Sequence, residues 1–163
     1  MPIAPIQKFL PIRCELRLPT VDLAGARSVT GLDENTIKLW IEAREIIAWD
    51  ISRSNAASAK SDEDRTRREL RILTVSARNA ADGRSTTYDD DKIIRLLYGP
   101  EKPFILGRDF RRSWNCDSGH MINLVDDQVL AVVKGTDHGR GRGRTPCITW
   151  SSAVAFLKQR RLS

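Results

Sequence analysis

The chain carries a weak internal repeat, which becomes visible when the sequence is slid along itself by 84 residues. Apolar character and turn-forming positions coincide at this offset, although few residues are identical. The matched pairs are Pro19 and Pro103, Asp33 and Asp117, Ile37 and Met121, Trp40 and Leu124, Ile41 and Val125, and Ile46 and Leu130. A repeat at a fixed offset indicates two copies of one supersecondary unit, so one local structure has to explain both stretches.

In the first copy, a short helix is expected after Thr20, a plausible N-cap residue, and Gly31 supplies a turn. Asp33 then caps a second helix, whose apolar residues Ile37, Trp40 and Ile41 recur at the spacing of one helical face. The segments 46–51 and 67–76 predict two strands joined by a polar segment, with Arg71 on the face opposite Leu70 and Ile72. A closing helix is predicted over 87–98 because Gly99 follows it.

The second copy predicts the same plan. Helices are expected over 107–114 and 117–130, strands over 130–135 and 145–149, and a closing helix over 150–162 with Ser151 as its N-cap. The two closing helices are aligned by placing Thr87 and Tyr88 on Thr149 and Trp150. The predicted fold is α+β and mainly helical, with one module in residues 1–100 and a second in 101–163.

The first copy contains the pattern "turn, Asp, polar, polar, Thr, Ile, x, x, Trp, Ile, Glu", followed by Ile-Ile-Ala-Trp. This pattern resembles the DNA-binding modules of excisionases and mercury-resistance-type regulators. The resemblance covers residues 18–76 and 103–162. It implies two winged helix-turn-helix modules in tandem, each with a small β-hairpin wing. That family usually has Gly at the end of its second helix, where this chain has Arg44 and Gln128. The helix end is therefore predicted to close differently.

The second helix of a helix-turn-helix enters the major groove with its N-terminal residues toward the base edges. Asn can bond adenine, Glu can accept from cytosine, and Lys can reach guanine or phosphate. Ser can contact a phosphate oxygen. The resemblance therefore predicts DNA contacts from Glu34, Asn35, Thr36 and Lys38 in the first copy and from Ser118, His120 and Asn123 in the second.

The connections between the predicted strands are basic. Arg67 and Arg68 lie at the end of the first, and Arg140, Arg142 and Arg144 alternate with glycines in the second. Narrow minor grooves attract inserted arginines, so these five residues are the candidate wing contacts to DNA. Residues 103–163 carry 10 Lys/Arg and 5 Asp/Glu, whereas residues 1–102 carry 17 and 16. The second copy is expected to supply more of the sequence-independent attraction.

Composition narrows the classes of function. The chain has 163 residues, a net charge of +6 and a pI near 9.6, which favours a polyanionic partner. No apolar run is long enough to span a membrane, no secretory leader is recognised, and three scattered cysteines indicate reduced thiols, so a cytoplasmic location is expected. A zinc site at Cys116 and His120 would need two further ligands, which Cys14, His138 or Cys147 would have to supply from distant loops. No catalytic motif is present. No metal, cofactor or catalytic residue is predicted.

The sequence therefore predicts a sequence-specific double-stranded DNA-binding protein of the phage or mobile-element type. It would act as a transcriptional regulator or as an excisionase-like architectural factor, with a recombinase, RNA polymerase or a second copy of the chain as further candidate partners. Two alternatives stay open. Winged helices also serve as protein-docking scaffolds, and the Arg-Gly segment at 139–144 is also typical of RNA-binding loops.

Overall fold

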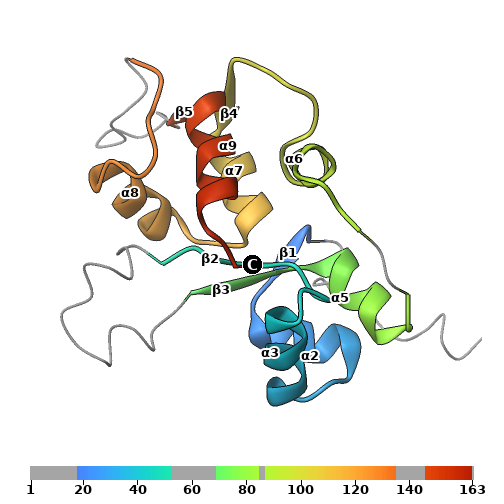
Figure 1. Cartoon of the computed structure of the whole chain (residues 1–163). Helices are drawn as coiled ribbons and strands as arrows, with labels where there is room; N and C mark the ends of the chain where they lie inside the picture. Colours follow the sequence, from blue (N-terminus) through green and yellow to red (C-terminus); the bar gives the residue numbers. More distant parts are fainter. Residues whose placement is uncertain (1–17, 53–68, 85–86, 135–145, 163) are drawn as a thin grey trace, which may run out of the picture.

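The computed structural model describes residues 18–52, 69–84, 87–134 and 146–162. Within these ranges the chain forms seven helices and two small antiparallel sheets, so the predicted α+β class is confirmed (Figure 1). The elements are β1 (Thr20–Val21), α2 (Leu23–Thr30), α3 (Glu34–Glu42), β2 (Ala48–Asp50), β3 (Leu70–Leu73), α5 (Thr74–Ala81), α6 (Asp90–Tyr98), β4 (Phe104–Leu106), α7 (Gly107–Trp114), α8 (Ser118–Asp126), β5 (Cys147–Thr149), α9 (Trp150–Gln159) and β6 (Arg161–Leu162).

Helices at an offset of 84 residues have the same lengths in both copies. The bounds of α7 and α8 are those of α2 and α3 moved by 84 residues. The intervening turn uses a left-handed residue in each copy, Gly31 with φ 72° and Asn115 with φ 47°. Asp33 and Asp117 cap the second helices by accepting backbone hydrogen bonds from Thr36 and His120. This capping satisfies one of the free N–H groups at each helix start.

The pairing pattern repeats in part, with the offset falling to 76 residues after the connecting segment, but the strand predicted over 130–135 is reduced to one bridge at Val132. Ala48 pairs with Ile72 in the first copy, and Val132 forms the corresponding bridge with Ile148 in the second. One hydroxyl is also repeated: Ser76 Oγ accepts from Ile47 N at 3.0 Å, and Ser152 Oγ accepts from Ala131 N at 2.8 Å. The first connecting segment is therefore eight residues longer than the second, and the register of the strands is otherwise the same.

The helix predicted to close the first copy is present as α6, but its assignment as the counterpart of α9 was wrong. Helix α5 begins directly after β3, where strand 67–76 was expected to continue, and it is the counterpart of α9. Thr74 N donates to Pro19 O just as Trp150 N donates to Pro103 O, so the end of the strand sets the start of the helix in both copies. Helix α6 instead follows the first copy, between α5 and β4.

Two predicted N-caps were also wrong. Thr20 lies in β1, and its hydroxyl donates to Ser113 O, while Asp22 caps α2 by accepting from Gly25 N at 2.7 Å. Helix α9 is capped by Thr149, whose hydroxyl accepts from Ser152 N, and Ser151 lies inside the helix. In both cases the capping residue is the last extended residue before the helix, two positions away from the residue expected.

The second helices close as they would with glycine, contrary to the sequence-based expectation. Arg44 and Gln128 adopt left-handed conformations with φ 63° and 61°, and each donates its N–H back into the preceding helix. Left-handed backbone costs a residue with a Cβ atom about 1 kcal/mol or more.

Gln128→Gly is therefore expected to raise the free energy of unfolding by about 0.5 kcal/mol, since the relief of strain exceeds the added entropy of the unfolded chain. Ala43→Gly is the control, because Ala43 ends α3 with φ −78° and gains nothing from glycine. It should lower the same quantity by about 0.5 kcal/mol. Urea unfolding followed by circular dichroism measures both, and a loss of stability in both variants would contradict the prediction.

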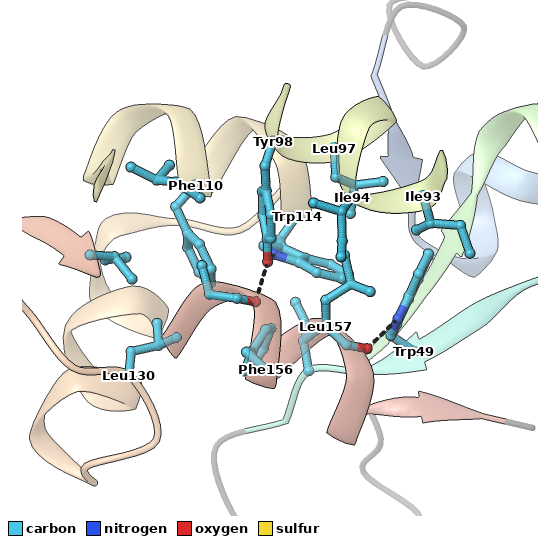
Figure 2. Packing of buried hydrophobic residues seen from close by; sticks show 14 of the residues in the cluster. Trp49, Ile93, Ile94, Leu97, Tyr98, Phe110, Trp114, Leu130, Phe156 and Leu157 are labelled. Carbon is cyan, nitrogen blue, oxygen red and sulfur yellow. Dashed lines mark hydrogen bonds between the residues drawn. The ribbon is translucent and has the colours of Figure 1, made fainter. Parts of the chain in front are cut away.

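The sheet of the first copy is buried on both faces. Ala48 and Ile72 point toward α2, α3 and α5, whereas Trp49 and Leu73 belong to the core built on the second copy. Figure 1 shows these helices below strands β1 to β3 and α7, α8 and α9 above them. The Trp49 indole lies edge-on to Trp114, with ring centroids 5.0 Å apart, and its Nε1 donates to Leu157 O at 2.9 Å (Figure 2).

The C-terminal strand ties the two copies together. Strand β6 pairs antiparallel with β2, which gives the sheet order β1-β3-β2-β6. Arg160 extends this contact by donating from Nη1 to Ser52 O at 2.8 Å. The outer edge of β2 is therefore covered by residues that follow the second copy.

Candidate nucleic-acid interface

Helix α3 presents an accessible polar side at its N-terminus. Ile37 and Ile41 are buried against α2 and the sheet, which leaves Asn35 and Lys38 exposed and Thr36 partly exposed. Hydrogen bonds from the side chain and backbone of Thr36 hold the pKa of Asp33 below its usual range. The capping carboxylate is thus ionised at neutral pH, and Thr36 is occupied in holding it.

Glu34 and Lys38 form an ion pair one helical turn apart, with 2.8 Å between Oε1 and Nζ. The hydrogen bond and charge of Lys38 hold the pKa of Glu34 below its usual range. About half of each side chain is exposed, so this pair contributes little to stability and its members can exchange partners. Both predicted contact residues are accessible, and a ligand has to compete with their mutual attraction.

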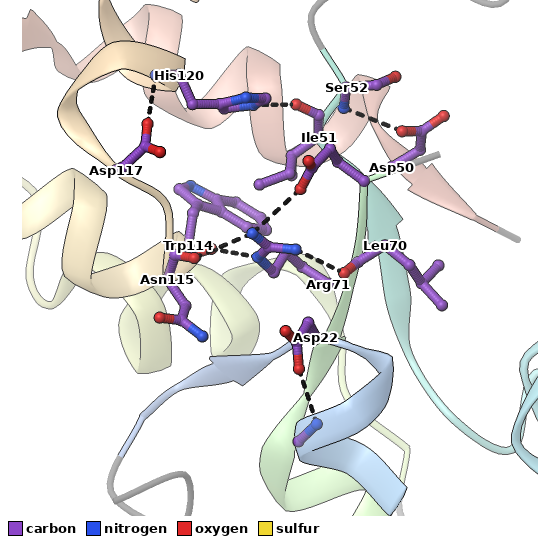
Figure 3. A network of polar contacts seen from close by, with 12 residues as sticks. Asp22, Asp50, Ile51, Ser52, Leu70, Arg71, Trp114, Asn115, Asp117 and His120 are labelled. Carbon is purple, nitrogen blue, oxygen red and sulfur yellow. Dashed lines mark hydrogen bonds and ion pairs between the residues drawn. The ribbon is translucent and has the colours of Figure 1, made fainter. Parts of the chain in front are cut away.

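Helix α8 is placed differently from α3, because one of its flanks contacts the first copy. His120 is partly buried, and its Nε2 lies 2.6 Å from Ile51 O at the end of β2 (Figure 3). Asn123 is also partly buried, one turn further along the helix. Ser118 and Gly119 are exposed. The structure therefore leaves the start of α8 accessible and uses His120 in a contact between the two copies.

Arg71 fixes the turn that precedes α8. Its Nε donates to Trp114 O at 2.7 Å, and one Nη donates to Asn115 O at 3.0 Å, while the other reaches Leu70 O at 2.9 Å (Figure 3). The residue is buried, with Glu69 as its ion-pair partner at 3.3 Å. The prediction that Arg71 faces the other side of its strand holds, but that side is the interface between the copies and not solvent.

Two residues of these helices were missed by the sequence analysis. Leu39 is 62% exposed on α3 and Ile122 is 45% exposed on α8. The sequence does indicate that both residues are exposed. Leu39 falls off the apolar face that Ile37 and Ile41 define in α3, and Ile122 falls off the face that Met121 and Leu124 define in α8. A large apolar residue off that face is accessible to a ligand.

The net positive charge lies outside the described residues. The described ranges hold 16 Lys/Arg and 16 Asp/Glu, whereas residues 1–17, 53–68 and 135–145 hold the other 11 and 5. Helices α3 and α8 each carry one acidic residue more than basic ones. The predicted contacts Arg67, Arg68, Arg140, Arg142 and Arg144 lie in these other segments, outside the described residues.

Burial raises the pKa of the Cys116 thiol to about 11, so this cysteine is protonated at neutral pH. No three His, Cys, Asp or Glu side chains in the described ranges gather closely enough to hold a metal ion. None of the described helices is long and apolar enough to cross a bilayer.

Comparisons with protein-family models, with curated proteins and with solved structures found no match.

Proposed function

We propose that the chain binds double-stranded DNA through two winged helix-turn-helix modules, with α3 and α8 as the groove-reading helices. The observation that carries this proposal is the repeated order of strand, helix, left-handed turn, capped helix, pairing segment, connecting segment and strand. The pairing segment is β2 in the first copy and a single bridge at Val132 in the second. In the first copy the first strand pairs with the third, which gives the order β1-β3-β2.

The polar residues of α3 suit the major groove. An exposed Asn35 beside the helix N-terminus can make two hydrogen bonds to adenine, and Lys38 can leave Glu34 for guanine or phosphate. Thr36 could contact a phosphate only after releasing the Asp33 carboxylate that it now holds. In α8, Ser118 takes the position of Glu34 and Asn123 the position of Leu39, so the second half-site should differ in sequence from the first.

Attraction to the phosphate backbone is assigned to the connecting segments. The described residues are neutral overall, and both groove-reading helices are slightly acidic. The excess of arginine in 53–68 and 135–145 falls between the paired strands of each copy, which is where a wing lies. Non-specific affinity should therefore come from the wings and sequence preference from the helices.

The close packing of the two copies suggests how one chain is used. Trp49, Arg71 and His120 each bond to the other copy, so the two helices are held in one fixed relation. A single chain would then bind DNA through two covalently linked modules that recognise different half-site sequences. The simplest consequences of binding are two. The protein could bend an attachment site and so affect a recombinase, or it could occlude a promoter and so affect RNA polymerase.

Gel-shift titrations at two salt concentrations test this proposal. Random duplex should bind at low salt and weaken steeply as salt rises, because each phosphate contact releases condensed counterions. In a selection from a random duplex pool, Asn35→Ala should lose preference at one base pair, at a cost of about 1–3 kcal/mol for the preferred sequence. Ser151→Ala, at an exposed position on α9, should leave both affinity and preference unchanged.

Three outcomes contradict the proposal. Absence of any shift at low salt would favour a protein-docking scaffold. Tighter binding to single-stranded RNA than to duplex DNA would favour the RNA-binding alternative. Equal weakening of every duplex by Asn35→Ala would show that α3 does not contact base edges.

A further inference from the structure

The outer sides of α3 and α8 each carry one large apolar side chain. Five such residues are exposed in the described ranges, and Leu39 and Ile122 are the most exposed of them, ahead of Leu96, Phe104 and Val75. Amphipathic helices bury apolar residues and expose polar ones, and the rest of α3 follows this rule. Leu39 and Ile122 do not contribute to the core, so they are available to a ligand.

The two residues occupy neighbouring positions in the repeat. At the offset of 84, Lys38 corresponds to Ile122 and Leu39 corresponds to Asn123. Each helix thus presents one apolar and one polar side chain at this pair of positions, in opposite order. The first half of each helix, with Asn35 on α3 and Ser118 on α8, lies one turn before the apolar residue.

Polar groups surround Leu39 on the helix surface. Asn35 lies one turn before it and Glu42 three residues after it, while Ala43 at the next turn is small. A protein-docking face is a contiguous apolar patch. A single apolar side chain among hydrogen-bonding groups instead suits a small apolar group set among polar ones. The C5-methyl of thymine is such a group, because it is the apolar feature of the base edges in the major groove.

We propose that Leu39 and Ile122 contact thymine methyl groups in the major groove and thereby select A·T pairs in the two half-sites. This inference rests on the proposed DNA-binding function and adds the residues that discriminate thymine. Asn35 and Leu39 share one side of α3, so adenine and thymine are read one helical turn apart on the protein. In α8 the apolar and polar positions are exchanged, which places the thymine contact of the second half-site differently from that of the first.

Removal of the methyl group from DNA tests this inference directly. A duplex pool enriched by selection on the full chain is amplified once with dTTP and once with dUTP, which keeps base pairing and removes every C5-methyl. The intact protein should bind the thymine pool more tightly, by about fourfold for each methyl that it buries. Leu39→Ala should weaken binding to the thymine pool by about fourfold and leave binding to the uracil pool nearly unchanged.

Alanine variants show whether the preference for the thymine pool comes from Leu39 and Ile122 or from any exposed apolar side chain. Leu39→Ala with Ile122→Ala should bring the ratio of the two affinities closer to one than either single change. Leu96→Ala, on exposed α6 surface, should leave the ratio as in the intact protein. Because Leu39 is 62% exposed, its truncation should not impair folding.

The possible results separate failure of the thymine contact from failure of the proposed DNA-binding function. Tight binding with equal affinity for both pools, or an unchanged ratio in Leu39→Ala, overturns the thymine contact and leaves DNA binding standing. Failure to enrich or bind either pool overturns both. A change of oligomeric state in Leu39→Ala, measured by light scattering, together with an unchanged ratio would assign Leu39 to self-association and also overturns the inference.

Discussion

Trp49→Ala is expected to lower the free energy of unfolding by about 3–5 kcal/mol, which is the largest loss of stability we expect from a single substitution in this chain. Trp49 is fully buried in β2 and faces the second copy. The change removes an edge-on contact with Trp114, an indole hydrogen bond to Leu157 O, and the volume of a large ring. The cavity would lie between the two copies, so neither copy could fill it by moving alone.

Trp49→Phe is the control for the hydrogen bond. It keeps an aromatic ring in the same place but leaves Leu157 O without its indole donor, and it should cost about 1–3 kcal/mol. Urea unfolding followed by circular dichroism in the far ultraviolet measures both variants, since three other tryptophans complicate fluorescence. Equal stabilities of the alanine and phenylalanine variants would show that the ring contributes nothing by packing.

The same experiment reports how the two copies unfold. One cluster of buried residues contains side chains of both copies, including Trp49 and Leu73 from the first and Phe110 and Phe156 from the second. A single transition is therefore expected in the intact protein and in Trp49→Ala. Two transitions, of which only one shifts in the variant, would show that the copies unfold separately.

The helices of the repeat could be predicted because their signals are local. The spacing of Ile37, Trp40 and Ile41 marks one face of a helix, and Asp33 marks its start. The same signals at Met121, Leu124 and Asp117 locate α8. Asn35 and Lys38 were correctly expected to be outside the core, because they fall off the apolar face. A helix carries such information within about a dozen residues.

Features that depend on distant partners could not be predicted in this way. Strand β1 has two residues, too few for any periodicity, and its position depends on pairing with β3, some fifty residues away. Helix α5 was missed because its buried face consists of the small residues Ser76 and Ala77 and not of large apolar ones. Alternation at 70–73 predicted a strand with one solvated face, but the second copy covers that face and buries Arg71.

The candidate site shows the same limit. The contact of His120 with Ile51 O joins residues 69 positions apart, and nothing near His120 in the sequence indicates it. Its counterpart in the first copy, Thr36, contacts its own N-cap residue instead. The repeat predicts equal local structure for the two helices, yet their surroundings differ because the copies pack asymmetrically. Sequence comparison of the copies therefore predicts which residues are equivalent and not which are accessible.

Arg140→Ala with Arg142→Ala and Arg144→Ala is expected to lower the affinity for every duplex by about two orders of magnitude at 0.1 M salt. The described residues carry no net charge, and 135–145 holds three arginines and one acidic residue, so we expect this segment to supply part of the attraction to phosphate. Each lost phosphate contact should reduce the slope of log affinity against log salt by about 0.9, or by about 2.7 for three contacts. Sequence preference should persist, because it is assigned to α3 and α8.

A variant with the same net charge provides the control. Arg78→Ala with Arg84→Ala and Arg95→Ala also removes three positive charges, from exposed positions on or just after α5 and on α6. If position matters, this variant should keep most of the salt slope of the intact protein, and the variant of 140–144 should not. Equal losses in the two triple variants would mean that net charge alone drives binding. A preserved slope in the variant of 140–144 would exclude this segment from the phosphate contacts and leave residues 53–68, with Arg67 and Arg68, as the other candidate wing.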